Sequence, residues 1–259
     1  EIDAVLILTP HHNHSDLVIK ALNKGKAVYV EKPLALDMQS ITDIEESIYR
    51  SENPKLFIGF NRRFSKSAQF IKQKLINNPA NSINLRFSVP PLDSNHWTNI
   101  KEIGGGRIVG EAVHGIDLAC YLFDSLPQSI SASAPIDKTN NMAKDNQVFL
   151  NINFANGSHA SLQYFSEANQ ILSKERIEVH GEGNSYILED FKMLRFLEGS
   201  QDRSKTFSSG KGHKESLGIF FDYVRDKSQN PFTWEEIKAV SKAAIIAQNH
   251  INSGQQHRV

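Results

Sequence analysis

Hydrophobic positions in the first sixty residues recur in short blocks that predict alternating strands and helices. The apolar runs at residues 5–9, 27–30 and 55–60 are typical of buried parallel strands. Between them, apolar residues return every three or four positions at residues 14–23, and again from Asp37 onward, as expected for helices. Strands that alternate with helices through short connections indicate an α/β arrangement, a doubly wound parallel sheet with right-handed crossovers.

The pattern changes after about residue 65, where alternation with a period of two predicts half-buried strands. The runs Val148–Phe154 and His159–Phe165 flank an Asn-Gly pair, which is a strong hairpin signal in this setting. Two helices are expected at the end of the chain, near Glu215–Asp226 and Trp234–Asn252. Antiparallel strands after the strand–helix region indicate a second domain of α+β type.

Composition narrows the range of partners. Lys and Arg together number 29, as do Asp and Glu, so no global field would attract nucleic acid or anionic lipid. No stretch approaches the roughly 20 apolar residues that span a bilayer. The single cysteine, Cys120, lies in an apolar helical pattern, which suits packing in a reducing compartment. We therefore expect a cytoplasmic protein without nucleic-acid or membrane partners.

The triplet Glu31-Lys32-Pro33 is the first candidate for chemistry. It follows the strand at residues 27–30, and open α/β sheets place their ligand crevice at the carboxyl ends of strands. Lys32 is therefore positioned to donate a proton or a hydrogen bond to a substrate oxygen. Taken alone, the triplet fits a solvated lysine beside a turn-forming proline better.

Two further segments follow neighbouring strands in the same way. In Thr9-Pro10-His11-His12-Asn13-His14, Thr9 and His14 are placed to contact a nucleotide. The three histidines also suggest a metal, but no Cys pair or His-Glu-x-x-His motif supplies further ligands, so no metal site is expected. After the third strand, Arg62 and Arg63 suit phosphate or carboxylate binding, or a solvated helix entry.

The richest block runs from Gly104 to Asp117. Glu111 and His114 are three residues apart, so on a helix they project from one face, and Asp117 could orient the imidazole. A histidine backed by carboxylates is suited to general acid–base catalysis near neutral pH. Alternatively, the acidic residues complement a helix dipole and His114 is a packed core residue.

These four segments, in this order and spacing, together resemble the Gfo/Idh/MocA family of glucose–fructose oxidoreductase and inositol dehydrogenase type. The resemblance implies a partial Rossmann domain over residues 1–64 and a C-terminal domain over residues 65–259 with a large open antiparallel sheet. The last helix is a candidate to pack back on the first domain. It also implies hydride transfer between NAD or NADP and a carbon of a sugar or polyol. A homo-oligomer formed through the open face of the sheet is expected.

The resemblance implies a role for each matching residue. Lys32 becomes the general acid/base on the substrate hydroxyl, and His114 its polar partner. The family often has an Asp four residues before this histidine, where the chain has Gly110, so the adjacent Glu111 is the candidate replacement, within reach of His114 or Lys32. The candidate cofactor-binding residues are Thr9, Pro10, His14, Glu31, Lys32 and Arg62. The candidate substrate-binding residues are Arg63, Trp97, Arg107 and Asp117.

One family feature has no counterpart in the sequence. The family opens with a strand, a Gly-x-Gly-x-x-Gly turn and a helix that holds the pyrophosphate, and the chain contains no such motif. We expect these elements upstream of a chain that begins directly in a strand-like run, and we expect weak NAD(H) binding without them. The alternatives are a non-catalytic binding or assembly module built on the open sheet and, less well supported, a metal-dependent lyase or isomerase.

Overall fold

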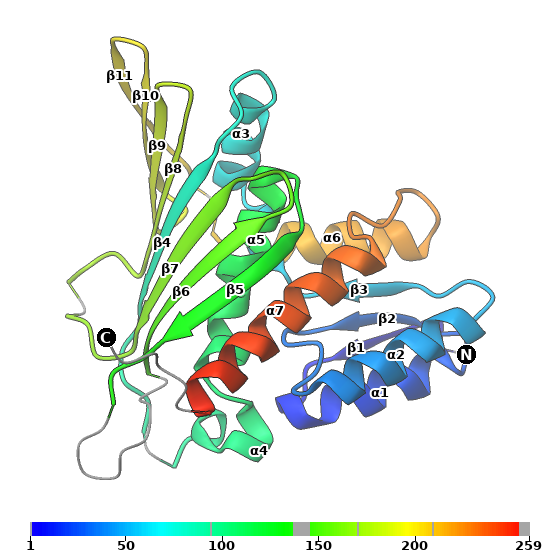
Figure 1. Cartoon of the computed structure of the whole chain (residues 1–259). Coiled ribbons are helices and arrows are strands. Elements are labelled where there is room, and N and C mark those ends of the chain that lie inside the picture. Colours follow the sequence, from blue (N-terminus) through cyan, green and yellow to red (C-terminus); the bar gives the residue numbers. More distant parts are fainter. Residues whose placement is uncertain (1, 94, 137–145, 170, 209, 254–259) are drawn as a thin grey trace.

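The computed structural model describes residues 2–93, 95–136, 146–169, 171–208 and 210–253 (Figure 1). Its first region is a parallel sheet of β1 (Ala4–Ile7), β2 (Ala27–Val30) and β3 (Leu56–Ile58), in that order. All four residues of β2 are buried because the strand lies between two neighbours and under helices. The α/β prediction for this region is confirmed, although β1 and β3 are shorter than the apolar runs suggested.

Helices from both ends of the chain cover this sheet. The connecting helices α1 (His14–Leu22) and α2 (Met38–Arg50) lie side by side (Figure 1). On the face that carries Tyr29 and Phe57, the ring of Phe220 packs at 5.5 and 5.7 Å between ring centroids. Phe220 belongs to α6 (His213–Val224), so a helix from the end of the chain completes the cover of the first sheet.

The last helix, α7 (Trp234–Asn252), also returns to the first region. Trp234 Nε1 donates to Glu45 Oε1 of α2 at 2.9 Å, and Lys238 Nζ contacts the same oxygen at 2.5 Å. Thr233 and Glu236 form the capping box that begins the helix. The last helix therefore contacts α2 of the parallel-sheet region.

The second region is a large sheet with the strand order β11-β10-β9-β8-β4-β7-β6-β5. Its strands are β4 (Ser82–Ser88), β5 (Pro127–Ser133), β6 (Gln147–Phe154), β7 (His159–Phe165), β8 (Glu175–Gly181), β9 (Asn184–Glu189), β10 (Met193–Glu198) and β11 (Gln201–Thr206). Every neighbouring pair is antiparallel except β4 with β7. Helices lie along one face and leave the other open (Figure 1), which confirms the large open sheet.

The two edge strands, β5 and β11, were not predicted from the sequence. β11 is polar throughout, and all six of its residues are exposed. An edge strand has one hydrogen-bonded neighbour and little apolar cover, so it lacks the alternation that marks an inner strand.

Between the two sheets lies α5 (Val113–Phe123), which is buried along most of its length. It continues directly from a π-helical turn, η4 (Ile108–Ala112), and packs against η2 (Asn61–Phe64), α7 and β7. The remaining short elements are η1 (His11–Asn13), α3 (Lys66–Leu75), η3 (Trp97–Asn99) and α4 (Lys101–Gly104). The boundary predicted between residues 64 and 65 falls between η2 and α3, in front of this central helix.

Candidate active site

Lys32 meets the start of the central helical segment directly beyond the carboxyl end of β2. Its Nζ donates to Gly110 O at 2.5 Å and to Glu111 Oε1 at 3.1 Å. The lysine side chain is 14% exposed and that of Glu111 is 38% exposed, so the pair borders solvent on the glutamate side. The proximity of Glu111 to Lys32 expected from the sequence is confirmed.

The π-helical turn explains how one segment offers Lys32 two acceptors. Val113 N donates to Ile108 O, five residues back, which widens the turn relative to an α-helix. The start of the turn is held by Gln248 of α7, whose Oε1 accepts from Ile108 N at 3.0 Å. The family resemblance implies an Asp carboxylate at position 110. Gly110 has no side chain, and its main-chain oxygen accepts a hydrogen bond from Lys32 instead.

His114 lies buried beside this pair, with an incomplete set of hydrogen bonds. It is 4% exposed, and within the described part of the chain its Nδ1 has no hydrogen-bond partner. Burial, reinforced by the positive charges of Arg62 and Lys32, holds the pKa of His114 well below its ordinary value of 6.5. The imidazole is therefore held in its neutral form, in which one ring nitrogen donates and the other accepts a hydrogen bond.

The carboxylate of Glu111 stays ionised next to this neutral ring. Burial alone would raise the pKa of Glu111, but the charges of Lys32 and Arg62 outweigh it and lower the pKa below 4.5. The site therefore combines an ammonium, a carboxylate and a neutral imidazole, which is the equipment for moving a proton to or from a hydroxyl group.

The histidines after β1 have structural roles. His14 is fully buried, with Nδ1 2.6 Å from Pro33 O and Nε2 2.9 Å from Thr9 O, so it ties together the turns that follow β1 and β2. His11 Nδ1 lies 2.8 Å from Gly104 O, and burial lowers the pKa of His11 to about 4. Among the described residues, no three His, Cys, Asp or Glu side chains form a group suited to a metal ion.

The exposed residues at this edge of the sheet suit a nicotinamide. Thr9 and Pro10 are exposed although they directly follow a sheet strand. Glu31 lies against Gly59, where a Cβ atom would come within 2.8 Å of the carboxylate. Lys32 N donates to Glu31 Oε2 at 3.3 Å, which holds the carboxylate at the rim of the crevice. These residues lie at the carboxyl ends of the parallel strands, where open α/β sheets bind nucleotides.

Arg62 is paired with a residue that the sequence analysis missed. Its Nε and Nη2 donate to the Glu175 carboxylate at 2.7 and 2.9 Å, and Lys211 Nζ contacts the same carboxylate. Glu175 is 1% exposed and occupies the inward face of β8 with Ile177 and Val179. A glutamate at an inward position of an alternating strand is a signal that could have found it.

Arg63 and Asp117 form a buried ion pair. Arg63 Nη2 donates to Asp117 Oδ1 at 2.6 Å and Nε to Oδ2 at 3.2 Å, with both side chains 3% exposed or less. The hypothesis that Asp117 orients the His114 imidazole is wrong, because its carboxylate faces Arg63 and His114 Nδ1 has no partner among the described residues. The structure places this pair behind the Lys32 site, between the two regions.

The two remaining candidates lie on the segment that leads into the central helix. The Trp97 ring meets the His11 ring edge-on, with the centroids 4.7 Å apart. Arg107 is 6% exposed, and its Nη2 donates to Asn99 Oδ1 at 2.6 Å. Through His11, Trp97 borders the turn that holds Gly110, and Arg107 contacts Thr98 and Asn99 of the preceding turn.

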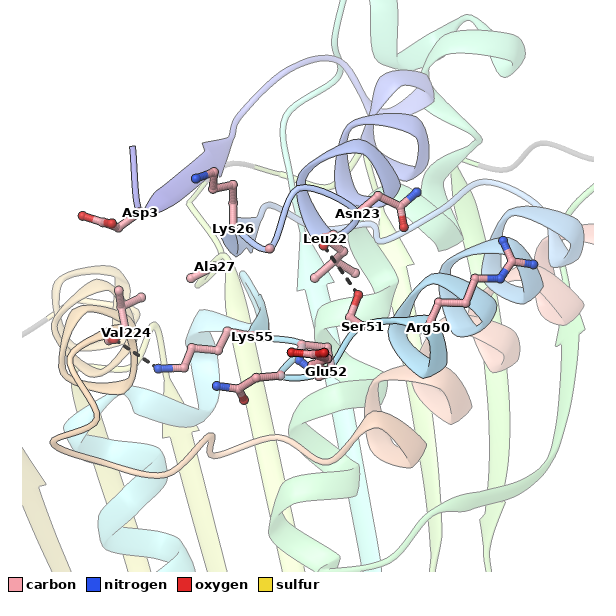
Figure 2. A pocket seen from close by; sticks show the side chains of 13 residues that line it. Asp3, Leu22, Asn23, Lys26, Ala27, Arg50, Ser51, Glu52, Lys55 and Val224 are labelled. Atoms are coloured by element: carbon pink, nitrogen blue, oxygen red, sulfur yellow. Dashed lines mark hydrogen bonds between the residues drawn. The ribbon is translucent and has the colours of Figure 1, made fainter. Parts of the chain in front are cut away.

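The opposite end of the parallel sheet carries a different hollow. It has a volume of about 560 Å³ and is lined by residues at the amino ends of the strands, among them Asp3, Lys26 and Lys55 (Figure 2). Lys55 Nζ donates to Val224 O at 3.1 Å, so it caps the end of α6. This hollow contains none of the residues predicted for chemistry.

No described helix has the length and apolar character needed to cross a membrane.

A family model described as an oxidoreductase family with an NAD-binding Rossmann fold matches residues 1–60. A second model, the GFO/IDH/MocA C-terminal domain, matches residues 78–187. The two matches fall on the two regions described above.

Known relatives agree with these matches. The chain is 28% identical over 237 residues to inositol 2-dehydrogenase of Rhizobium meliloti, covering 80% of this chain and 69% of that protein. It is 24% identical over 226 residues to myo-inositol 2-dehydrogenase of Thermotoga maritima, covering 85% of this chain and 64% of that protein. The chain thus spans about two thirds of the length of these relatives.

A solved structure shares the fold. Levoglucosan dehydrogenase in complex with NADH and levoglucosan superimposes with a TM-score of 0.80 and 20% identity, covering 98% of this chain and 79% of that one. The fold, the order of the motifs and both family models agree. The chain belongs to the Gfo/Idh/MocA family of NAD-binding oxidoreductases.

Proposed function

We propose that this chain carries the catalytic pocket of an NAD- or NADP-dependent dehydrogenase that acts on a hydroxyl-bearing carbon of a sugar or polyol. The observation that carries this proposal is the position of Lys32 Nζ at the carboxyl end of β2. There it is held by Gly110 O and Glu111, beside the unpartnered Nδ1 of buried His114. The printed names of the relatives, which include inositol and levoglucosan dehydrogenases, support the substrate class.

Each residue has a distinct proposed role. Lys32 exchanges the proton of the substrate hydroxyl, and Glu111 stabilises the ammonium form of the lysine. His114 stays neutral and hydrogen-bonds the same or a neighbouring hydroxyl through its imidazole. Arg63 and Asp117 support this arrangement from the interior and do not touch the substrate, while Trp97 borders it through His11.

The cofactor would lie along the carboxyl ends of β1 and β2. Its nicotinamide half would contact the exposed residues Thr9 and Pro10 and the carboxylate of Glu31. The buried side chains of His14 and Arg62 would support this half of the site without being exposed to it. When bound, the nicotinamide accepts or returns a hydride at the substrate carbon. The comparisons with oxidoreductases favour this function over a non-catalytic binding or assembly module.

The test is formation of reduced nicotinamide by the full-length protein from a panel of inositols and sugars with NAD⁺ and with NADP⁺. Lys32→Ala should lower kcat by about 10²–10⁴-fold, the usual contribution of general acid–base catalysis, with little change in KM. Lys26→Ala is the matched control because Lys26 precedes β2 at its amino end, in the hollow of Figure 2. Equal losses in both variants, or an effect of Lys32→Ala on KM alone, would contradict the proposal.

We also propose that the open face of the large sheet pairs with a second copy of the chain. Phe149 is 39% exposed on this face, with its ring 5.5 Å from that of Phe165. An exposed aromatic pair on an uncovered sheet is typical of an interface. Light scattering after gel filtration should give at least a dimer, and Phe149→Lys should shift the mass toward the monomer.

A further inference from the structure

The ring of His11 packs against the turn that presents an acceptor to Lys32. Its Nδ1 lies 2.8 Å from Gly104 O, the first residue of the glycine corner at residues 104–106. A Cβ atom at Gly110 would lie 3.3 Å from the Cε1 atom of the same ring. The imidazole therefore fills the space where a side chain at position 110 would begin, and it is hydrogen-bonded to the corner that leads there.

This hydrogen bond defines the protonation of the ring. A carbonyl oxygen only accepts, so His11 Nδ1 carries the hydrogen and donates it to Gly104 O. Burial lowers the pKa of His11 to about 4, so the imidazole is neutral near pH 7. The edge-on contact with the Trp97 ring, at 4.7 Å between centroids, fixes the orientation of the imidazole. The donor is therefore available and correctly oriented at any pH near neutrality.

The glycine corner has no side chains of its own to anchor it. Gly105 and Gly106 have φ values of +80° and +97°, in the left-handed region that favours glycine. A Cβ atom would lie 2.4 Å from Leu36 Cδ2 at the first of them and 2.4 Å from Gln248 Oε1 at the second. The corner thus fits closely between other segments, and its position depends on contacts that they make. The hydrogen bond from His11 is one of these contacts.

The corner is connected to Lys32 through the main chain. Gly110 N donates to Gly106 O at 2.9 Å, so the position of the corner determines that of Gly110. Gly110 O accepts from Lys32 Nζ, and Glu111 Oε1 accepts a second hydrogen bond from the same atom. An ammonium group has three donors, so these two acceptors set the direction of the third. A shift of the corner would therefore turn the lysine head group.

We propose that His11 is a positioning residue for Lys32. By holding the glycine corner and filling the space beside Gly110, its imidazole keeps Gly110 O where it accepts from the ammonium. The third donor of Lys32 is then directed at the substrate hydroxyl. The inference rests on the proposed function and deepens it, because it names a residue that sets the geometry of proton exchange without touching the reacting atoms.

Chemical labelling of Lys32 in the full-length protein tests this inference without relying on turnover. His11→Phe keeps an aromatic ring beside Trp97 but removes the donor to Gly104 O, whereas His11→Asn keeps a donor. Limited reductive methylation, followed by mass spectrometry of peptides, should modify Lys32 about 10-fold faster in His11→Phe than in the wild type. That factor corresponds to one lost hydrogen bond of a charged group. His11→Asn should react like the wild type.

Two controls separate positioning from general loosening. Lys26, at the opposite end of β2, should be methylated at the same rate in every variant. His12→Phe makes the same chemical change at the exposed neighbouring residue and should leave the labelling of Lys32 unchanged. If His11→Phe fails to fold, nitrogen NMR of the wild type still tests the geometry, because it should show a neutral His11 ring with hydrogen on Nδ1.

Kinetics of the full-length protein then show whether His11 acts through the lysine. His11→Phe should lower kcat about 10-fold with little change in KM, and His11→Asn should retain most of the activity. In the Lys32→Ala background, His11→Phe should cause no further loss, because the group that it positions is absent. A residue with a purely structural role would cause the same loss in both backgrounds.

Four results would overturn the inference. They are unchanged labelling of Lys32 in His11→Phe, equally faster labelling of Lys26, a further loss in the Lys32→Ala background, and a His11 ring with hydrogen on Nε2. Failure of the proposed function gives a different outcome. A full-length protein without dehydrogenase activity would contradict the function, while the labelling rates would still decide the role of His11. Activity that depends on Lys32 but not on His11 would contradict only the inference.

Discussion

Two ion pairs join the parallel-sheet region to the same helical segment, and their surroundings differ. Lys32 and Glu111 are 14% and 38% exposed, and the pair borders the crevice at the carboxyl end of β2. Arg63 and Asp117 are 3% and 1% exposed, and the arginine also lies over the Phe232 ring with 4.5 Å to its centroid. The first pair is partly exposed to solvent, whereas the second is almost completely buried.

The difference shows that charge and sequence position do not by themselves distinguish the proposed catalytic pair from a buried structural pair. All four residues belong to the segments that suggested the family, and each pair links a cation after a strand to a carboxylate on the helix. Arg63–Asp117 is buried and joined by two hydrogen bonds, so it is a structural ion pair between the two regions. Lys32–Glu111 is partly exposed, and this exposure is why we propose it, and not Arg63–Asp117, for chemistry.

The largest expected contrast is in stability. Arg63→Met should lower the free energy of unfolding by about 3–5 kcal/mol, because it leaves the Asp117 carboxylate buried without a partner. Lys32→Met, at the more open pair, should change it by about 1 kcal/mol or less. Urea unfolding monitored by fluorescence measures both. The double variant Arg63→Met/Asp117→Leu should recover most of the loss, and equal losses from the two single variants would remove the distinction.

The second prediction concerns pH and the buried histidine that supports the open pair. Burial lowers the pKa of His11 from 6.5 to about 4. Between these two pH values the unfolded chain binds a proton at His11 and the folded chain does not. Its contribution to stability is complete above pH 6.5 and is lost as the pH falls toward 4, by about 3 kcal/mol. His11→Asn should flatten the dependence of unfolding free energy on pH in this range. His12→Asn, at the exposed neighbouring residue, should retain it.

The smallest effects are expected within the open pair itself. Glu111→Gln should lower kcat/KM by about 10- to 100-fold, the magnitude of one lost charged hydrogen bond, and His114→Gln by about 10-fold, because its imidazole is neutral. The double variant should lose less than the product of the two factors, because both residues act on the same lysine and substrate. If Glu111→Gln is nearly silent while His114→Gln is damaging, Glu111 has only a capping role.

Local sequence patterns were sufficient to predict most of the inner strands and long helices. The period-two and helical repeats located the inner strands and long helices, because each of these elements buries one face or stripe. The position of Lys32 followed from the rule that ligands bind at the carboxyl ends of parallel strands. The expected proximity of Glu111 to Lys32 is also found, with 3.1 Å between Lys32 Nζ and Glu111 Oε1.

Contacts between distant parts of the chain could not be read in this way. The partner of Arg62 is Glu175 on another sheet, and the partner of Arg63 is Asp117, which the sequence analysis had assigned to His114. The main-chain acceptor at Gly110 depends on a π-helical turn held by Gln248 from the last helix. Sequence alone thus determined the elements and the family, which depend on local periodicity and motif order. Only the tertiary structure decided which charges are paired, buried or left open, because pairing depends on how distant segments pack.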